Sequence, residues 1–388
     1  MLQKMVLTNF LSFRERTEFD FTPSRYGILN KTNVSSTDVL KGALFIGPNA
    51  SGKTNALKGL KFLIDFICGD ATPITAYRCV FGGEAIIGAE YTFCFQGQSV
   101  FYQVSYDPKK STLYENLKLN DKQVLQRAGK QGQLHLSETP IIDDQLDEMT
   151  SFLRTASFNT GRFPQNRILR ELMDYIVNSY YIDGYCGMAR LGATASRFAE
   201  TGGIGKLNQY LEAFHYDFTA EYGSESTGAR IQLRIGSNGG KEQKVLFLKR
   251  NGYPCPFDIY HESQGNQVFI DLLPNLIRVI EKPGMLAIDE FGNSLHDDLE
   301  EKIVRFFMKK ADQSQLFITS HSTNLISNSV FRPDQINLIT FAENQEKKDM
   351  WSSHTVRLSR FKPREAQNME KMYLSGMFGG LPNYGEEV

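Results

Sequence analysis

The sequence has no run of apolar residues long enough to cross a membrane and no pair of cysteines in a C-x-x-C pattern. The longest apolar stretch near the N-terminus, residues 62–68, is broken by Asp65, whereas a membrane helix needs about 20 apolar residues. The N-terminal segment is too short and too polar for a signal peptide. The five cysteines are scattered, which gives no support to a zinc ribbon or a redox pair. We therefore expect a soluble, cytoplasmic protein with reduced cysteines and no membrane contact.

An excess of charge of one sign is also missing. Lys and Arg number 43 against 44 Asp and Glu, so the formal net charge is −1. A protein that coats nucleic acid would be strongly basic, so this class is not indicated, although a local basic patch is compatible with the balance. No heptad pattern persists and no internal repeat occurs, which argues against a long coiled coil or a solenoid. With 41% hydrophobic residues among 388, the chain can bury a large core.

The distribution of apolar residues predicts a mixed α/β chain with two kinds of β-structure. Short apolar runs at residues 43–46, 285–288 and 316–319 are typical of buried strands in a parallel sheet. Alternation of apolar and other residues over 89–106 instead predicts an antiparallel sheet beside the first parallel strand. Helices are expected where apolar residues recur every three or four positions, over 57–67, 168–176, 207–214, 268–276 and 299–308.

The middle of the chain, from about residue 140 to 228, differs from both ends because helical patterns surround a glycine-rich stretch. We expect residues 184–205 to form a loop. Strands are expected to return at 231–235 and 245–248. Pro274 is expected to kink or shorten the helix that begins near residue 268.

Residues 47–54, GPNASGKT, fit the pattern G-x-x-x-x-G-K-[ST] in full. Glycines let the backbone bend so that its N–H groups point at phosphate oxygens, and the helix that follows adds the positive end of its dipole. Lys53 would reach the β- and γ-phosphates of a bound nucleotide, and Thr54 would bind Mg²⁺. An apolar strand before the motif and an amphipathic helix after it are the context that this pattern needs. The residues predicted to hold the nucleotide are Gly47, Pro48, Asn49, Ala50, Ser51, Gly52, Lys53, Thr54 and Asn55.

Polar side chains also follow the two later parallel strands, at the sheet edge where ligands bind. Asp289 would hold Mg²⁺ through its water shell, and Glu290 would polarise the attacking water as a general base. His321 could hydrogen-bond to the γ-phosphate and to that water. The competing interpretation is structural. Asp289 and Glu290 would then form a solvated acidic turn, and His321 would have a purely structural role.

Together these motifs resemble the heads of ATP-binding-cassette (ABC) and SMC-type ATPases. In that family a signature loop precedes the second motif. Residues 261–267, HESQGNQ, look like a degenerate copy of its Glu-Ser-x-Gly-Thr-Gln form, with Asn266 in place of Thr. The resemblance implies that Ser263 and Gly265 face the γ-phosphate held by a second subunit. Otherwise Ser263 is a plain helix cap.

Both ends of the chain carry further motifs. They are the triplet Ser-Leu-His at 294–296, the opening L-x-N-F-x-S-F at 7–13, and the C-terminal stretches 319–326, 361–364 and 370–382. In these motifs the chain is similar to a narrower group, the OLD-like and abortive-infection ATPases of phage defence (AbiL/Rlo type). No motif of this kind covers the middle of the chain.

This resemblance implies an α/β fold: a P-loop NTPase of ABC/SMC-head type with an antiparallel β subdomain and a helical insertion. We expect ATPase lobes at residues 1–140 and 229–388 and the insertion at 141–228. Two subunits would sandwich two ATP molecules with Mg²⁺, in a homodimer or a higher oligomer. Slow ATP hydrolysis would then work as a switch in anti-phage defence. Since the chain ends at Val388 without a fused nuclease domain, a separate effector of Toprim, HNH or RNase type is expected as its partner.

Two other classes of function remain open. A DNA-repair ATPase of the RecF/SMC kind would bind DNA directly, and a non-catalytic scaffold would bind ATP only structurally. Arg14 and Arg16 would either contact the nucleotide or be solvated. Four further arginines would form a patch for nucleic acid or a partner, or be ordinary surface residues. They are Arg190, Arg197, Arg360 and Arg364.

Overall fold

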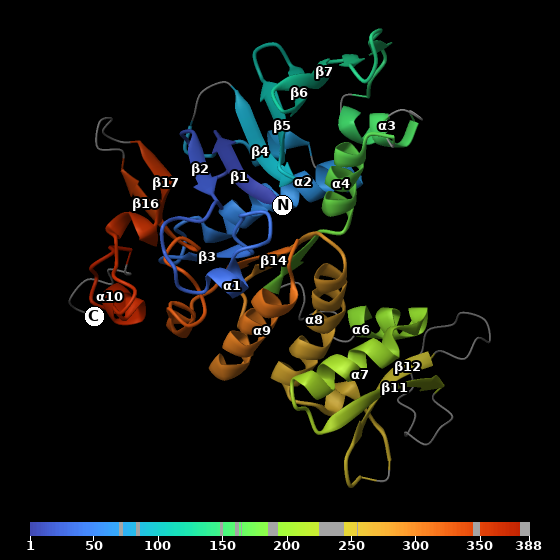
Figure 1. The fold of residues 1–388 in the computed structure, drawn as a ribbon, viewed down its shortest axis with the longest axis vertical. Helices are drawn as coiled ribbons and strands as arrows, with labels where there is room; N and C mark the ends of the chain where they lie inside the picture. Colours follow the sequence, from blue (N-terminus) through green and yellow to red (C-terminus); the bar gives the residue numbers. More distant parts are fainter. Residues whose placement is uncertain are drawn as a thin grey trace. The chain divides into compact units, whose positions relative to one another are not determined.

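The computed structural model describes residues 1–69, 73–82, 86–147, 150–159, 163, 165–184, 193–224, 244–253, 255–343 and 350–380. The chain divides into two compact units (Figure 1). The first contains Met1–Ile182, Val279–Phe291 and Glu300–Val388, and the second contains Asp183–Arg278 and Gly292–Leu299. Each unit therefore combines stretches that are distant in the sequence. The three-part division with borders near residues 140 and 228 stays a prediction.

The first unit contains a large antiparallel sheet with the strand order β2-β1-β4-β5-β6-β7-β8-β9. Apolar side chains alternate along β4 and β5, so one face of the sheet is buried, as the sequence pattern predicts. The strands are β1 (Leu2–Thr8), β2 (Thr17–Asp20), β4 (Ile87–Phe95), β5 (Gln98–Asp107), β6 (Thr112–Leu119), β7 (Lys122–Ala128), β8 (Gln131–Leu134) and β9 (Ile141–Asp143).

The second sheet of this unit has the order β10-β14-β15-β3-β16-β17. Strands β14, β15, β3 and β16 run parallel to one another, and β17 pairs antiparallel with β16 at the edge. The strands are β3 (Gly42–Ile46), β10 (Tyr180–Asp183), β14 (Met285–Asp289), β15 (Gln315–Thr319), β16 (Ile336–Glu343) and β17 (Trp351–Arg357). The predicted combination of a parallel α/β core with an antiparallel sheet is confirmed.

Helix α2 (Lys53–Cys68) contacts both sheets of the first unit. Its Gly59 lies so close to β1 that a Cβ atom there would approach Met5 Sδ to 2.9 Å, and the Gly59 carbonyl accepts a hydrogen bond from Tyr91 on β4. On its other side, α2 contacts β14 and β15. The helix therefore holds the start of the parallel strand–helix unit against the antiparallel sheet.

Helix α4 (Arg167–Val177) also belongs to the first unit, although it lies in the segment predicted as an insertion. Its Tyr175 is buried and packs edge-on against the rings of Phe93 and Phe95, and the Tyr175 hydroxyl donates a hydrogen bond to Gln315 at the start of β15. Helix α3 (Phe152–Asn159) precedes it.

The second unit contains α6 (Ala193–Phe198), α7 (Ile204–Ala213), most of α8 (Gln264–Glu281), and a small antiparallel sheet of β11 (Phe218–Ser224), β12 (Lys244–Arg250) and β13 (Phe257–Asp258). The prediction that residues 184–205 form a loop is wrong where the structure describes them, because α6 and a short π-helix, Ala199–Gly203, lie there. The Asp271 carboxylate accepts the N–H groups of Thr194 and Ala195 at the start of α6. A side chain that is distant in the sequence therefore caps α6, and the local sequence pattern does not predict this helix.

Two further expectations concern the second half of the chain. Pro274 does not shorten α8, which continues to Glu281. Leu276, Ile277 and Val279 are fully buried, and their burial offsets the roughly 3 kcal/mol cost of an internal proline. The strand expected at 231–235 lies outside the described residues.

Helix α9 (Asp297–Lys310) connects the end of β14 with β15, as predicted. A short helix, α10 (Met369–Leu374), lies near the C-terminal end of the described chain. Within the described residues, no helix is both long and apolar enough to span a bilayer.

Candidate functional site

Residues 47–52 form a turn between β3 and α2, which is the strand–loop–helix context that the sequence motif needs. Gly47 has φ +145°, and a Cβ atom there would lie 2.0 Å from the Ile339 carbonyl oxygen on β16. Gly52 has φ +109°, and a Cβ atom there would lie 2.4 Å from Ser353 Oγ on β17. Both positions therefore require glycine, for backbone conformation and for space.

The turn also contains an unsatisfied polar group. Ser51 is buried, with 2% of its surface exposed, and its Oγ has no hydrogen-bond partner among the described residues. A buried hydroxyl without a partner costs about 1–3 kcal/mol. Because the N-terminal N–H groups of α2 lie at the same turn, a phosphate group would satisfy both. The loop therefore fits the nucleotide phosphates that the motif predicts.

Lys53 is the first residue of α2 and is also buried. Its Nζ donates hydrogen bonds to the carbonyl oxygens of Gly47 and Pro48, each over 2.9 Å. Burial lowers the pKa of Lys53, while the charges of Asp289 and Glu290 act in the opposite direction. The ammonium group thus contacts the backbone of the phosphate loop and lies within electrostatic range of the Asp289 and Glu290 carboxylates.

Asp289 joins the phosphate loop to the end of the parallel sheet. Its Oδ1 accepts a hydrogen bond from Thr54 Oγ1 over 3.1 Å and another from Thr319 Oγ1 over 2.6 Å. The Asp289 side chain is buried, with 5% of the residue exposed. The structure therefore brings together the two predicted Mg²⁺ ligands, which are 235 residues apart in the chain.

These two side chains fit a magnesium site. Mg²⁺ prefers oxygen ligands and is usually held by one or two protein groups together with substrate phosphates and waters. Thr54 supplies a hydroxyl and Asp289 a carboxylate at the edge of the phosphate loop. In the part of the chain that the structure describes, no group of three or more His, Cys, Asp or Glu forms a metal site by itself. The donor set thus suits a metal shared with a nucleotide.

Glu290 and His321 lie at the same sheet edge as Asp289. Glu290 has a left-handed backbone, with φ 52°, and its N–H donates to Thr319 Oγ1 over 2.7 Å. His321 follows β15 and is exposed. Burial of part of the ring lowers the pKa of His321, the positive charge of Lys53 lowers it further, and Asp289 raises it. Lys53, Asp289, Glu290 and His321 therefore form one electrostatic cluster.

Three serines connect the phosphate loop to neighbouring strands, and the sequence patterns did not single out this contact. Ser353 Oγ on β17 donates a hydrogen bond to the Ser51 carbonyl over 2.6 Å and lies 2.7 Å from Ser12 Oγ. The predicted ligand Asn55 donates its amide to the same Ser12 over 2.9 Å. Asn55 therefore supports the loop in this structure, and its predicted nucleotide contact stays a prediction.

The predicted signature loop lies in the second unit. Ser263 Oγ accepts the N–H of Asn266 over 3.3 Å, which makes it the cap of α8. Glu262 connects the loop to β12 and to α8, because its carboxylate accepts hydrogen bonds from Arg250 over 2.6 Å and from Asn266 over 2.7 Å. Gly265 lies close to the loop after β14, since a Cβ atom there would approach the Ser294 carbonyl to 2.7 Å. The motif at 294–296 and the signature loop therefore touch each other.

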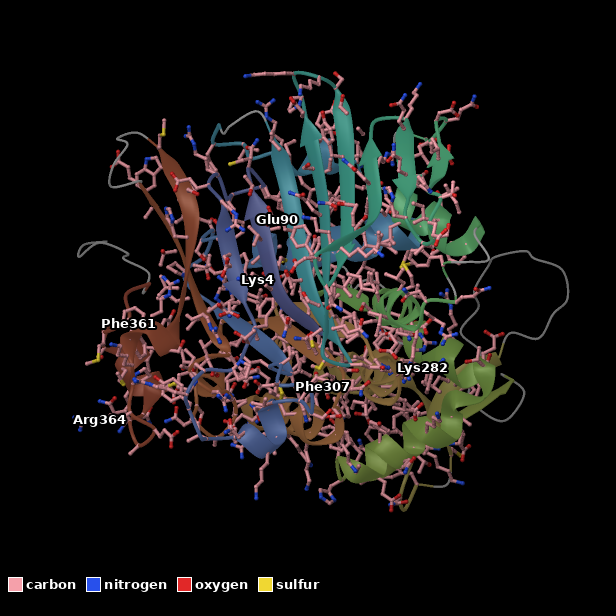
Figure 2. All side chains as sticks on the ribbon, turned by 45° about the horizontal axis from the view of Figure 1, so that its top comes forward. Lys4, Glu90, Lys282, Phe307, Phe361 and Arg364 are labelled. Carbon is pink, nitrogen blue, oxygen red and sulfur yellow. The ribbon has the colours of Figure 1, made fainter. Side chains whose placement is uncertain are left out.

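The predicted arginines have different surroundings. The Arg14 guanidinium donates to the Phe81 carbonyl, and Arg16 forms ion pairs with Glu18 and Glu90. Arg364 lies near the C-terminal end of the described chain (Figure 2), and its backbone N–H donates to the side chain of Gln367. Arg190 lies outside the described residues. The proposed arginine patch thus stays a prediction.

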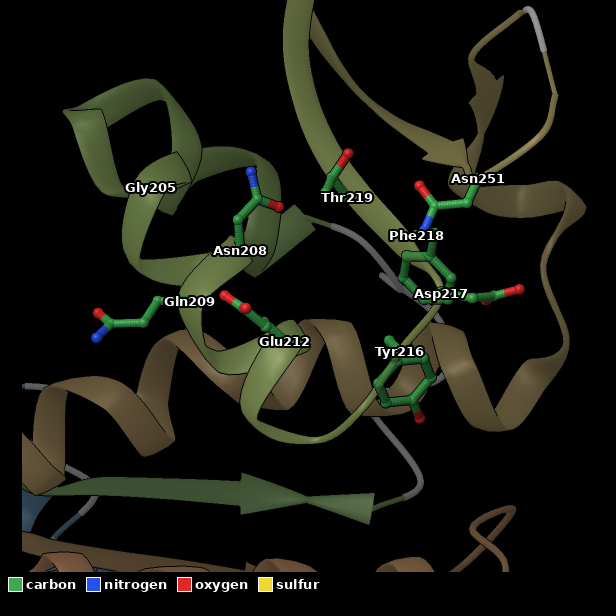
Figure 3. A pocket seen from close by; sticks show the side chains of 9 residues that line it. All are labelled: Gly205, Asn208, Gln209, Glu212, Tyr216, Asp217, Phe218, Thr219 and Asn251. Carbon is green, nitrogen blue, oxygen red and sulfur yellow. The ribbon is translucent and has the colours of Figure 1, made fainter.

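A pocket of about 400 Å³ lies in the second unit between α7 and β11 (Figure 3). Asn208 in its wall is satisfied by two hydrogen bonds with the backbone of Ala220. None of the side chains that line the pocket belongs to a predicted site.

A phosphate loop and a strand-end Asp-Glu pair on a parallel sheet define a P-loop nucleotide-binding protein. Comparison with known families shows which family the chain belongs to. Residues 43–327 match the family described as "AAA domain, putative AbiEii toxin, Type IV TA system". The chain belongs to this family.

Solved structures with a similar fold include two SMC heads. The SMC head domain from Thermotoga maritima is 14% identical, with a TM-score of 0.45 over 92% of this chain and 98% of that one. An SMC head bound to the C-terminal winged-helix domain of ScpA is 13% identical, with a TM-score of 0.47 over 93% of this chain and 99% of that one. No curated protein matches the chain.

Proposed function

We propose that this protein binds ATP with Mg²⁺ at residues 47–54 and hydrolyses it slowly. The observation that carries the proposal is the hydrogen bond between Thr54 and Asp289, because it joins a phosphate loop and a strand-end carboxylate into one site. The buried Lys53 and the hydroxyl of Ser51, which has no partner among the residues that the structure describes, supply further donors for phosphate oxygens. A neutral nucleoside has no phosphate oxygens to accept these hydrogen bonds, so Lys53 and Ser51 favour a phosphorylated ligand.

In this proposal each residue has a separate role. Lys53 neutralises charge on the β- and γ-phosphates, and Thr54 and Asp289 hold the metal. Bound Mg²⁺ would neutralise charge that develops on the phosphate oxygens. Glu290 accepts a proton from the attacking water, and His321 hydrogen-bonds to the γ-phosphate. The close backbone attachment of Glu290 to Thr319 supports a fixed position for the base.

ATP would also join two copies of the chain. Ser263 caps α8 and Gly265 lies in its first turn, and the N-terminus of a helix of this length is an anion site. The resemblance to ABC and SMC heads supports their placement against the γ-phosphate of the opposite subunit. The nucleotide would therefore close a homodimer, and hydrolysis would release it.

We further propose that this switch works in anti-phage defence and controls a separate effector protein, such as a Toprim, HNH or RNase-type nuclease. The motifs shared with the OLD-like and AbiL/Rlo-type ATPases support the defence role. The matched family's description, which refers to a toxin of a type IV toxin–antitoxin system, supports a regulatory setting of this kind. Both statements depend on similarity rather than on the chemistry of the site.

The substitution Glu290→Gln tests the mechanism. It removes the general base but keeps the size of the side chain, so ATP and Mg²⁺ should accumulate a stable dimer that light scattering detects after gel filtration. Adding Lys53→Ala to this variant should abolish the dimer because ATP no longer binds. If Glu290→Gln never changes its oligomeric state with ATP, the sandwich mechanism is wrong.

The same preparation separates the competing functions. ATP-dependent DNA binding by the purified protein alone, at moderate salt, would favour a RecF/SMC-like repair ATPase. Unchanged cellular function after Glu290→Gln, with loss only after Lys53→Ala, would favour a scaffold. For the defence role, co-purification with the product of the neighbouring gene should give a nuclease whose activity changes with ATP.

A further inference from the structure

Three aromatic side chains of the first unit form an exposed cluster at the end of the β16–β17 hairpin. The cluster consists of Phe81, Phe341 and Trp351, and Phe81 and Trp351 keep 43% and 47% of their surface exposed. The rings of Phe81 and Phe341 are 4.8 Å apart, and those of Phe341 and Trp351 are stacked at 5.7 Å. Exposed aromatic faces that are already ordered against each other are a common feature of binding sites.

This aromatic cluster lies next to the phosphate loop. The carbonyl of Ile339, two residues before Phe341 on β16, is the atom against which Gly47 packs. Ser353, two residues after Trp351 on β17, donates its hydrogen bond to Ser51 in the loop. Two residues of a strand span about 7 Å. The cluster therefore begins about 7 Å from the strand residues that contact the loop.

The order of the strands gives the direction from the loop to the cluster. Asp289, Glu290 and His321 follow β14 and β15, which lie on one side of β3. Strands β16 and β17, with Phe341 and Trp351, lie on the other side of β3 (Figure 1). A nucleotide whose terminal phosphate points toward Asp289, with its base on the opposite side of β3, would place that base near the aromatic cluster.

Arg14 joins the cluster to the β1–β2 turn. Its guanidinium donates to the carbonyl of Phe81 over 3.2 Å, and its backbone N–H donates to Ser352, the neighbour of Trp351, over 3.1 Å. A guanidinium held at the backbone of Phe81 adds a planar cation that can also stack on a base.

We propose that the aromatic cluster and Arg14 form the nucleobase subsite, where a purine base stacks on Trp351 and Phe81. The proposal rests on the proposed nucleotide site at residues 47–54. Stacking uses the face of the base and does not read its edge, so the site distinguishes a nucleotide from a bare polyphosphate more strongly than adenine from guanine. Phe341 lies between the other two rings and holds them in place.

The single tryptophan of the chain makes the first test direct, because all tryptophan fluorescence comes from Trp351. ATP and ADP should both quench or shift this emission, after correction for absorbance by the nucleotide. Inorganic tripolyphosphate should compete with ATP but leave the emission unchanged. The response to ADP excludes a signal from dimerisation, because ADP lacks the γ-phosphate that closes the proposed dimer.

Variants give the second test, with binding measured by calorimetry. Trp351→Ala and Phe81→Ala should each weaken ATP binding about 5- to 100-fold and leave tripolyphosphate binding unchanged. Trp351→Phe should keep most of the affinity. Phe158→Ala, at a more exposed aromatic residue on α3 (72% exposed), should have no effect.

Two failures have different meanings. If ATP binds in a Lys53-dependent manner while Trp351 emission and the affinity of Trp351→Ala stay unchanged, the base subsite is wrong and the phosphate site stands. If neither ATP nor tripolyphosphate binds, or if binding survives Lys53→Ala, the proposed function itself is wrong.

Discussion

The hydroxyl of Thr319 donates a hydrogen bond to Asp289 Oδ1 over 2.6 Å and accepts the backbone N–H of Glu290 over 2.7 Å. Thr319 is the last residue of β15 and is almost fully buried. One side chain thus fixes the carboxylate of the proposed metal ligand Asp289 and the backbone of the proposed general base Glu290. The N–H of Phe291, which donates to the Thr319 carbonyl over 2.8 Å, completes the attachment.

Thr319→Val should therefore impair catalysis more than binding. Valine has nearly the same shape but loses a hydrogen bond to a charged group, which should lower the free energy of unfolding by about 1.5–3 kcal/mol. Displacement of Glu290 should lower kcat about 10- to 100-fold, with a smaller change in KM. Thr319→Ser keeps the hydroxyl and should keep most of the activity. A valine variant with normal kcat in a steady-state ATPase assay would exclude this positioning role.

The two glycines of the phosphate loop lead to a prediction about stability and binding together. Gly47→Ala places a methyl group against the backbone of Ile339, which cannot rotate away, so it should destabilise the protein and abolish ATP binding. Gly97→Ala is the matched control, because Gly97 has φ +76° but nothing within 4 Å of a Cβ atom. The control should cost only the backbone strain, about 1–2 kcal/mol in urea unfolding, and should bind ATP normally. Equal losses in both variants would mean that space at Gly47 does not matter.

The part of the site that depends on local sequence could be predicted, and the part that depends on tertiary contacts could not. Residues 47–54 carry their own strand and helix signals, and Asp289 ends an apolar strand, so their common edge follows from parallel-sheet geometry. Thr319 was missed as a functional residue, although the register that pairs Ile288 with Ile318 places it beside Asp289. Such a register is set by packing across the sheet.

Two other features show the same limit. Ser353 supports the phosphate loop from a strand 302 residues away from Ser51, and no pattern links these positions. Helix α6 depends on the carboxylate of Asp271, 77 residues beyond Thr194, so its glycine-rich surroundings predicted a loop instead.

The antiparallel sheet contains a buried ion pair that should dominate the stability of its outer strands. Glu115 and Arg127 have no exposed side-chain surface and lie 2.9 Å apart. Glu115 also accepts hydrogen bonds from Tyr102 and from the N–H of Phe152, which fixes the start of α3. Arg127→Met leaves the carboxylate buried without its partner, so the free energy of unfolding should fall by about 3–5 kcal/mol.

A surface ion pair of the same sheet is the control for this prediction. Lys4 and Glu18 are 3.0 Å apart with about 40% of each side chain exposed, and Lys4 is on β1 in Figure 2. Glu18→Gln should change the free energy of unfolding by at most about 1 kcal/mol. If both substitutions cost the same in chemical denaturation, burial does not set the strength of the Glu115–Arg127 pair.

His321 gives a prediction about pH. Burial and the charge of Lys53 lower its pKa below the ordinary value near 6.5, so the ring should stay neutral while the pH falls through 6.5. The unfolded chain takes up this proton first, so stability should decrease as the pH falls below about 6.5. An NMR titration of His321 should have its midpoint below 6.5, and the acid limb of kcat/KM that His321→Gln removes should lie in the same range. Lys53→Met removes one of the two causes, so the midpoint should move up toward the ordinary value. A midpoint at or above 6.5, or one that Lys53→Met does not move, would contradict the electrostatic cluster of Lys53, Asp289 and His321.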